Sequence, residues 1–278
     1  MPRWRKITFY VLAALMLAMI LGFLWPILMF VVLAWLPIDT WQAMFPGEDI
    51  NAGFVVHRIH VLAEGLIFWG LAIGVGLQLW KPRKRQAPML QALAVVVAFL
   101  VIGLASGSFV AEEEILFVAG VALLALLHPA RERFYRFGKP DAAMAGLAVL
   151  AAVPGAFFII DHIDKQRINL AGDEHAEFAH WAAMAVFSTV LILWGLIGST
   201  DLTGWRVTAW LAGVSAATYG VSSLVFPTMP STVDIGWAIA AIAWGVAYIV
   251  LAERRTRSTA LRSMNAAARG VNSEVGAA

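Results

Sequence analysis

Long apolar runs separated by short polar loops dominate the chain. A helix needs about 20 mainly apolar residues to cross the hydrocarbon core of a bilayer. Eight runs therefore predict transmembrane helices, at about residues 7–36, 54–80, 88–110, 115–128, 142–160, 178–198, 205–226 and 235–252. The first run is too long for one straight crossing, so we expect Pro26 to kink it and Pro37 to end it. The fourth is short unless its helix begins within the acidic run Glu112–Glu114.

The composition supports this interpretation. The chain is 61% hydrophobic and only 14% charged, whereas a soluble domain carries about 25% charged residues. A soluble domain, a disordered chain and a nucleic-acid-binding protein are thereby excluded. Because there is no cysteine, disulfides and thiolate metal sites are excluded as well. The sequence predicts an all-α integral membrane protein whose immediate partner is the lipid bilayer, with no nucleic acid as a partner.

The distribution of charge predicts the orientation of the helices. Lysine and arginine concentrate in the short cytoplasmic loops of membrane proteins. Seventeen of the 20 basic residues lie on one side of the eight-span topology if both termini are cytoplasmic. We therefore expect residues 1–255 to form one transmembrane domain of the plasma (inner) membrane, with both termini inside. Residues 256–278, which are small, polar and basic, are expected to form a partly disordered cytoplasmic tail.

Two short segments suggest an internal duplication. Phe68-Trp69-Gly70-Leu71 in the second span has a counterpart in Leu193-Trp194-Gly195-Leu196 in the sixth. Two repeats of four spans, at residues 1–139 and 140–255, would have the same orientation in the membrane. The alternative is that small and aromatic residues are simply common in membrane helices.

Histidines gather at the expected outer ends of the spans. Five of the six histidines lie there. In the second span, His57, His60 and Glu64 are spaced i, i+3 and i+7, which places them on one helix face. Glu64 would lie about 10 Å deeper than His57. An ionisable group at that depth usually faces the protein interior and marks a functional site.

A second group of acids and histidines precedes the sixth span. Asp173, Glu177 and His180 share a face if the helix extends that far outward. His175 would then point elsewhere, unless the helix begins later and the loop turns this side chain inward. His162, near the end of the fifth span, and Glu114, in the turn before the fourth, are expected at the same membrane face.

Imidazoles and carboxylates without thiolates are typical ligands of zinc, iron, manganese or copper(II). We expect a divalent ion, zinc or iron, held by His57, His60 and His180. His175 or His162 would be a fourth ligand, and Glu114 a neighbouring acidic ligand. Glu64 and Glu177 would act as a catalytic base or as further ligands. The alternative to a metal site is a hydrogen-bonded polar cluster.

The layout also resembles that of haem A synthases. The shared features are eight spans, both ends inside and outward histidines on spans two and six, with His57-Arg58 echoing the His-Arg pair of that family. The resemblance implies a b-type haem as the alternative cofactor. Two features depart from the family: histidines are missing from the outer ends of spans four and eight, and His180 is followed by Trp181.

These observations lead to a main functional hypothesis and three alternatives. The main one is a metal-dependent membrane enzyme that acts on a lipid or other small hydrophobic substrate. The alternatives are a haem or quinone redox protein, a proton-coupled transporter in which Glu64 titrates, and an accessory subunit of a membrane complex. A homo-oligomer is compatible with each of them.

Overall fold

The computed structural model describes residues 2–44, 55–108, 112–134, 138–168 and 172–275, and this part of the chain is helical without strands. The longer helices are α1 (Arg3–Phe23), α2 (Trp25–Leu33), α4 (Arg58–Gly76), α5 (Gln86–Ser106), α6 (Glu112–Leu127), α7 (Ala142–Ile168), α9 (His180–Ser199), α10 (Trp205–Val225) and α11 (Ile235–Val275). The shorter elements are α3 (Ile38–Met44), α8 (Glu174–Glu177) and the 3₁₀ turns η2 (Leu77–Leu79), η3 (Pro82–Lys84) and η4 (Arg131–Arg133).

Six helices in the described residues are long and apolar enough to cross a membrane. They are α1, α4 extended by η2, α5, α7, α9 and α11. The apolar part of α6, Ile115–Leu127, is shorter, and α10 carries several serines and threonines in its sequence. The protein is therefore a helical membrane-type protein, and the eight-span count stays a prediction.

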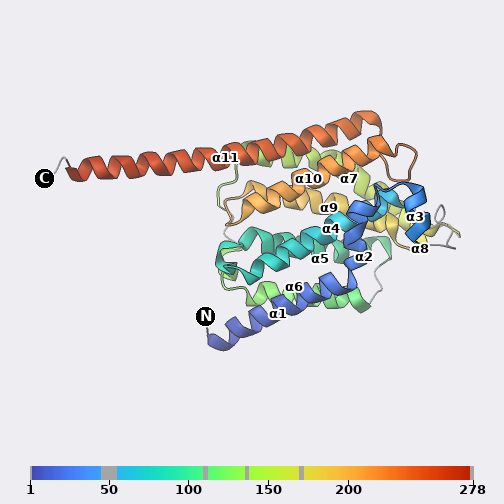
Figure 1. Ribbon diagram of the computed structural model, residues 1–278, viewed down its shortest axis with the longest axis horizontal. Helices are drawn as coiled ribbons and strands as arrows, with labels where there is room; N and C mark the ends of the chain where they lie inside the picture. The colour runs from blue at the N-terminus through green and yellow to red at the C-terminus, as the bar shows by residue number, and fades with distance from the viewer. Residues whose placement is uncertain (1, 45–54, 109–111, 135–137, 169–171, 276–278) are drawn as a thin grey trace.

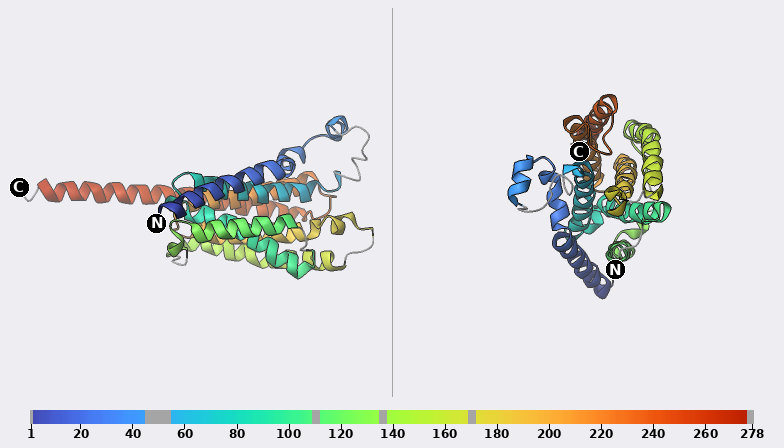
Figure 2. Two further views of the ribbon diagram at one scale, coloured as in Figure 1. Left: turned by 90° about the horizontal axis from the view of Figure 1, so that it is seen from below. Right: turned by 90° about the vertical axis from the view of Figure 1, so that its right-hand side faces the viewer.

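The helices form an elongated bundle. Both chain ends lie at the same end of it, and α3 and α8 lie at the other (Figure 1). The second half of α11 projects well beyond the bundle (Figure 2). Residues 256–275, which belong to the tail that the sequence predicts to be partly disordered, form the end of α11. Its alanines and arginines are strong helix formers.

The first apolar run is interrupted at Pro26 and ends before Pro37, as the sequence predicts. α1 ends at Phe23 and α2 begins at Trp25, so the helix is interrupted directly before Pro26. Proline lacks the N–H that would continue the helical hydrogen bonds and clashes with the preceding turn. α2 ends at Leu33, four residues before Pro37.

The fourth apolar run begins as the sequence suggests, because α6 starts at Glu112 within the acidic run.

The centre of the bundle consists of α4, α5 and α9. The Trp194 indole of α9 is fully buried and donates a hydrogen bond to the Gln91 carbonyl of α5 at 3.1 Å. The Gln91 side chain in turn donates to the Gly70 carbonyl of α4 at 2.6 Å. A Cβ atom at position 70 would overlap the Trp194 ring, so the close approach of α4 and α9 requires glycine there. These contacts fix the positions of the two helices that carry the candidate site.

The outer helices expose apolar side chains. Leu150 and Phe157 of α7 are 66% and 73% exposed, and Trp237 of α11 is 56% exposed. A soluble protein would bury such side chains, because large exposed apolar surfaces favour association or membrane contact. Lipid tails would cover these faces in a bilayer.

His128, directly after α6, is a fully buried histidine with both ring nitrogens satisfied. Nε2 donates a hydrogen bond to the Pro82 carbonyl at 3.1 Å, and the Ala130 amide donates to Nδ1 at 3.1 Å. One donor and one acceptor nitrogen make up a neutral imidazole. His128 is therefore a structural histidine that ties the end of α6 to η3.

We expect this histidine to make folding stability depend on pH. Burial lowers the pKa of His128 from 6.5 to about 4. As the pH falls from 6.5 to about 4, the unfolded chain takes up a proton on this histidine that the folded chain does not. The free energy of unfolding is therefore full above pH 6.5 and decreases by about 3 kcal/mol over this interval. The melting temperature in detergent, followed against pH, checks this. In His128→Gln the decline should be shallower; equal declines in both proteins would contradict the assignment.

Candidate metal centre

Three histidines from α4 and α9 meet at the end of the bundle opposite the chain ends. His57 directly precedes α4, His60 lies in its first turn, and His180 is the first residue of α9. One nitrogen from each ring lies within 4.8 Å of the others, so the three residues could hold a metal ion. His57 is 2% exposed and His60 is fully buried. Burial, followed by repulsion from His175, lowers the pKa of His57, which favours the neutral form that binds metals.

His175 joins this group because the helix before α9 is broken. Ala179 has a left-handed backbone conformation (φ 56°) and separates α8 from α9. The shared helical face predicted for Asp173, Glu177 and His180 therefore does not form. The break turns His175 inward, to centroid distances of 4.4 Å from His57 and 4.9 Å from His60. Together, these four rings are called the histidine cluster below.

Several ring nitrogens of the histidine cluster are buried without a hydrogen-bond partner among the described residues. They are Nδ1 and Nε2 of His57, Nδ1 of His60, Nε2 of His175 and Nδ1 of His180. A buried polar atom without a partner costs about 1–3 kcal/mol, and native proteins rarely leave several of them together. The contrast with His128 is direct, since both nitrogens of that buried ring are satisfied.

In each of the four rings, one nitrogen faces a polar side chain. His57 Nε2 lies 3.7 Å from Glu174 Oε2. His180 Nε2 lies 3.8 Å from Glu64 Oε1, and His175 Nδ1 lies 3.3 Å from Asp173 Oδ1. His60 Nε2 lies 2.9 Å from the hydroxyl of Ser231. Histidines that bind metals characteristically use one nitrogen for the ion and the other for a carboxylate, carbonyl or water. The histidine cluster has this arrangement.

Asp173 connects the histidine cluster to Trp181. It accepts a hydrogen bond from the indole N–H at 2.9 Å. Burial by itself raises the pKa of Asp173, but the hydrogen bond from Trp181 and the hydrogen bonds and charge of His175 together outweigh it, so the pKa lies below the ordinary value. The Trp181 ring stacks on His175 with a centroid distance of 5.0 Å. The Trp181 side chain therefore forms part of the wall of the histidine cluster.

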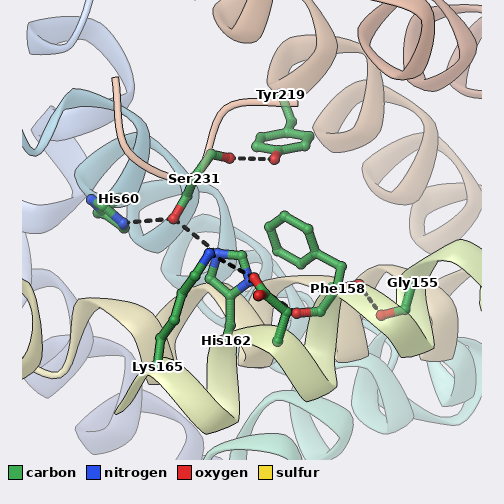
Figure 3. Close-up of polar contacts among 9 residues, drawn as sticks. His60, Gly155, Phe158, His162, Lys165, Tyr219 and Ser231 are labelled. Carbon is green, nitrogen blue, oxygen red and sulfur yellow. Dashed lines mark hydrogen bonds and ion pairs between the residues drawn. The ribbon is translucent and has the colours of Figure 1, made fainter. Parts of the chain in front are cut away.

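His162 lies next to the histidine cluster, but both of its ring nitrogens are engaged. Nδ1 donates a hydrogen bond to the Phe158 carbonyl of its own helix at 2.9 Å, and Nε2 lies 2.9 Å from the Ser231 hydroxyl. Figure 3 shows Ser231 between His162 and His60. The Ser231 hydroxyl thus separates His162 from the histidine cluster. His162 is not among the rings whose nitrogens could share an ion.

The predicted acidic residues fall in different places. Glu64 lies on α4 at the inner side of the cluster, facing His180. Glu177 is exposed at the end of α8. The side chain of Glu114 lies outside the described part of the structure. Of the two predicted catalytic acids, the structure brings only Glu64 to the histidine cluster.

A cavity of about 180 Å³ adjoins the histidine cluster. Glu64 is its acidic wall, and Phe178 and Ala179, just before His180, form part of its rim. The remaining lining residues are mostly apolar, namely Phe68, Phe99, Gly103, Ser108, Ala182, Ala183 and Val186. An apolar group placed in this cavity would have the Glu64 carboxyl group beside it.

Ser231 is the site residue that the sequence does not reveal. It lies in the turn between α10 and α11, and its distance from His60 in the sequence is 171 residues. The only local signal is Pro230, which marks a turn. Nothing in a turn sequence indicates which helix end its hydroxyl will contact.

Comparison with protein-family models, with curated proteins and with solved structures finds no match for this chain. The fold and the site themselves define the class: an all-helical, membrane-type protein with a buried histidine cluster that could hold a metal ion.

Proposed function

We propose that this chain is a metal-dependent membrane enzyme that acts on a lipid or other small hydrophobic substrate. The metal is a divalent ion, zinc or iron, with His57, His60 and His180 as ligands and His175 as the fourth. The observation that carries the proposal is the set of buried ring nitrogens that have no hydrogen-bond partner among the described residues, on rings of which three bring one nitrogen each within 4.8 Å of the others.

The geometry suits a single ion. A tetrahedral zinc ion with bonds of about 2.0–2.1 Å holds its ligand nitrogens about 3.4 Å apart. The three candidate nitrogens lie within 4.8 Å of one another, so small movements of the side chains close the remaining gap. The ion would also satisfy atoms that are costly to bury without partners.

The same geometry favours an ion over haem, the alternative cofactor. A b-type haem bound by two imidazoles lies as a flat macrocycle between their rings. Two pairs of rings in the histidine cluster have centroids 6.1 Å apart, near the spacing of two axial imidazoles, but the other two rings lie 4.4–5.1 Å from both members of each pair. The rings themselves occupy the space that a macrocycle would need.

The apolar cavity supports a hydrophobic substrate. A bound ion acts as a Lewis acid that polarises a substrate carbonyl or activates water. Glu64 lies both in the cavity wall and 3.8 Å from His180. It is therefore positioned to take a proton from a water molecule in the site and to pass it to a substrate whose apolar part occupies the cavity.

The proposed setting is the plasma membrane, with eight spans and both termini cytoplasmic. The chain ends share one end of the bundle, and α8 lies at the other (Figure 1). His175 of the histidine cluster belongs to α8, and the other three rings lie at the starts of α4 and α9. Together with the basic loops, this arrangement supports a site that opens outward. Two repeats of four spans and a homo-oligomer belong to the same proposal.

Metal analysis of the purified protein tests the proposal. We expect freshly purified wild-type protein to contain about one zinc or iron ion per chain by mass spectrometry of the metals. A visible spectrum of the same preparation separates the alternatives, since a Soret band would indicate haem instead. Protein without stoichiometric metal, after preparation in the absence of chelators, would overturn the proposal.

A further inference from the structure

We propose that Ser231 and His162 are positioning residues that hold His60 in the one tautomer able to bind the ion. This inference rests on the proposed metal function and deepens it. A series of hydrogen bonds leads from the Phe158 carbonyl on α7 to His60 on α4, and Figure 3 shows all of its contacts.

The first step fixes the tautomer of His162. A carbonyl oxygen only accepts hydrogen bonds, so the 2.9 Å contact with Phe158 requires the proton of His162 to be on Nδ1. The side chain is 2% exposed, and a charged imidazole is costly to bury. In the neutral ring, Nε2 then carries the lone pair and is an acceptor.

The second step fixes the direction of the Ser231 hydroxyl. Its oxygen lies 2.9 Å from His162 Nε2 and 2.9 Å from His60 Nε2. Because His162 Nε2 accepts, the hydroxyl donates its single proton to His162. The hydroxyl oxygen is then left to accept from His60, whose proton must therefore be on Nε2.

The position of the proton on His60 decides which of its nitrogens is available to the histidine cluster. With its proton on Nε2, neutral His60 carries its lone pair on Nδ1. Nδ1 is the His60 nitrogen that is buried without a partner among the described residues. The tautomer that the hydrogen bonds impose is thus the tautomer that leaves a ligand atom available on the side away from Ser231.

The backbone at Ser231 supports a specific role for this hydroxyl. Ser231 has a positive φ of 63°, a conformation that is uncommon for residues other than glycine and that persists where the surroundings enforce it. The Tyr219 hydroxyl donates a hydrogen bond to the Ser231 carbonyl at 2.6 Å. The loop is thereby held in a conformation that carries the side chain between the two histidines.

Nitrogen NMR of metal-free protein labelled with ¹⁵N-histidine tests the tautomer directly, with His60→Gln used to assign the signals. We expect His60 to be protonated on Nε2 alone and His162 on Nδ1 alone. In Ser231→Gly, which removes the hydroxyl at a φ that glycine favours, His60 should become a mixture of tautomers. A proton on Nδ1 of His60, or on both nitrogens of His162, would overturn the inference.

Zinc affinity, measured by competition with a chelating dye, provides the second readout. We expect Ser231→Gly and His162→Phe to weaken zinc binding by about 10–100-fold, as is usual when a partner of a ligand histidine is lost. Thr232→Ala is the matched control, because its hydroxyl bonds only within the same loop, and its affinity should match the wild type. Unchanged affinity in Ser231→Gly would overturn the inference, whereas wild-type protein that binds no zinc would overturn the proposed function and leave the tautomer test intact.

Discussion

Replacing either His60 or His180 by alanine is expected to reduce bound metal from about one ion per chain to less than about one tenth. Each substitution removes one of the three rings whose nitrogens converge. Loss of an outer partner of a ligand already weakens binding by about 10–100-fold, so loss of a ligand itself should weaken it further. Metal content after purification, and zinc affinity by competition, measure the effect.

The matched control for this experiment is His128→Ala. His128 is as deeply buried as His60, but its nitrogens are satisfied by Pro82 and Ala130 at the other end of the bundle. This variant should lose stability and keep its metal. If His128→Ala lost metal as completely as His60→Ala, the loss would reflect damaged folding. If the variants at positions 60 and 180 kept a full ion, the histidine cluster would not be the metal centre.

Removing the ion with a chelator should lower the melting temperature of the wild-type protein by about 10 °C. A ligand present at about 1,000 times its dissociation constant stabilises the folded state by about 4 kcal/mol. In a protein of this size each kcal/mol shifts the melting temperature by about 2–4 °C. The metal-free protein would also bury unpartnered imidazole nitrogens, which adds to the loss.

Thermal unfolding in detergent, with and without chelator and after zinc is restored, measures this change. The His60→Ala protein serves as the reference, since it should melt at one temperature whether or not chelator is present. Identical melting of wild-type protein in all three conditions would contradict a structural contribution of the ion.

The sequence predicts much of the fold because its strongest signals are local. The position of each long helix follows from runs of apolar residues, and the break between α1 and α2 follows from Pro26. The spacing of His57, His60 and Glu64 predicts a shared helix face, and the structure has His60 and Glu64 in α4 with His57 directly before it. These features depend on neighbours within a few turns, which a single sequence displays.

The parts that the sequence does not predict depend on tertiary contacts. The inward turn of His175 requires the break at Ala179, a residue type with no preference for a left-handed conformation. The contact of Ser231 with His60 and His162 depends on how α10 and α11 pack against α4 and α7. Such contacts join residues far apart in the chain, and no local pattern specifies them.

The separation of the cluster residues along the chain also bears on how the protein matures. His57 directly precedes α4, His60 lies in its first turn, His180 begins α9, and Ser231 lies in the turn between α10 and α11. During synthesis, the first two imidazoles are made long before the third. The ion proposed here, which is held by all three rings, therefore binds only after α9 has packed against α4, and metal loading would be a late event that reports on completed assembly.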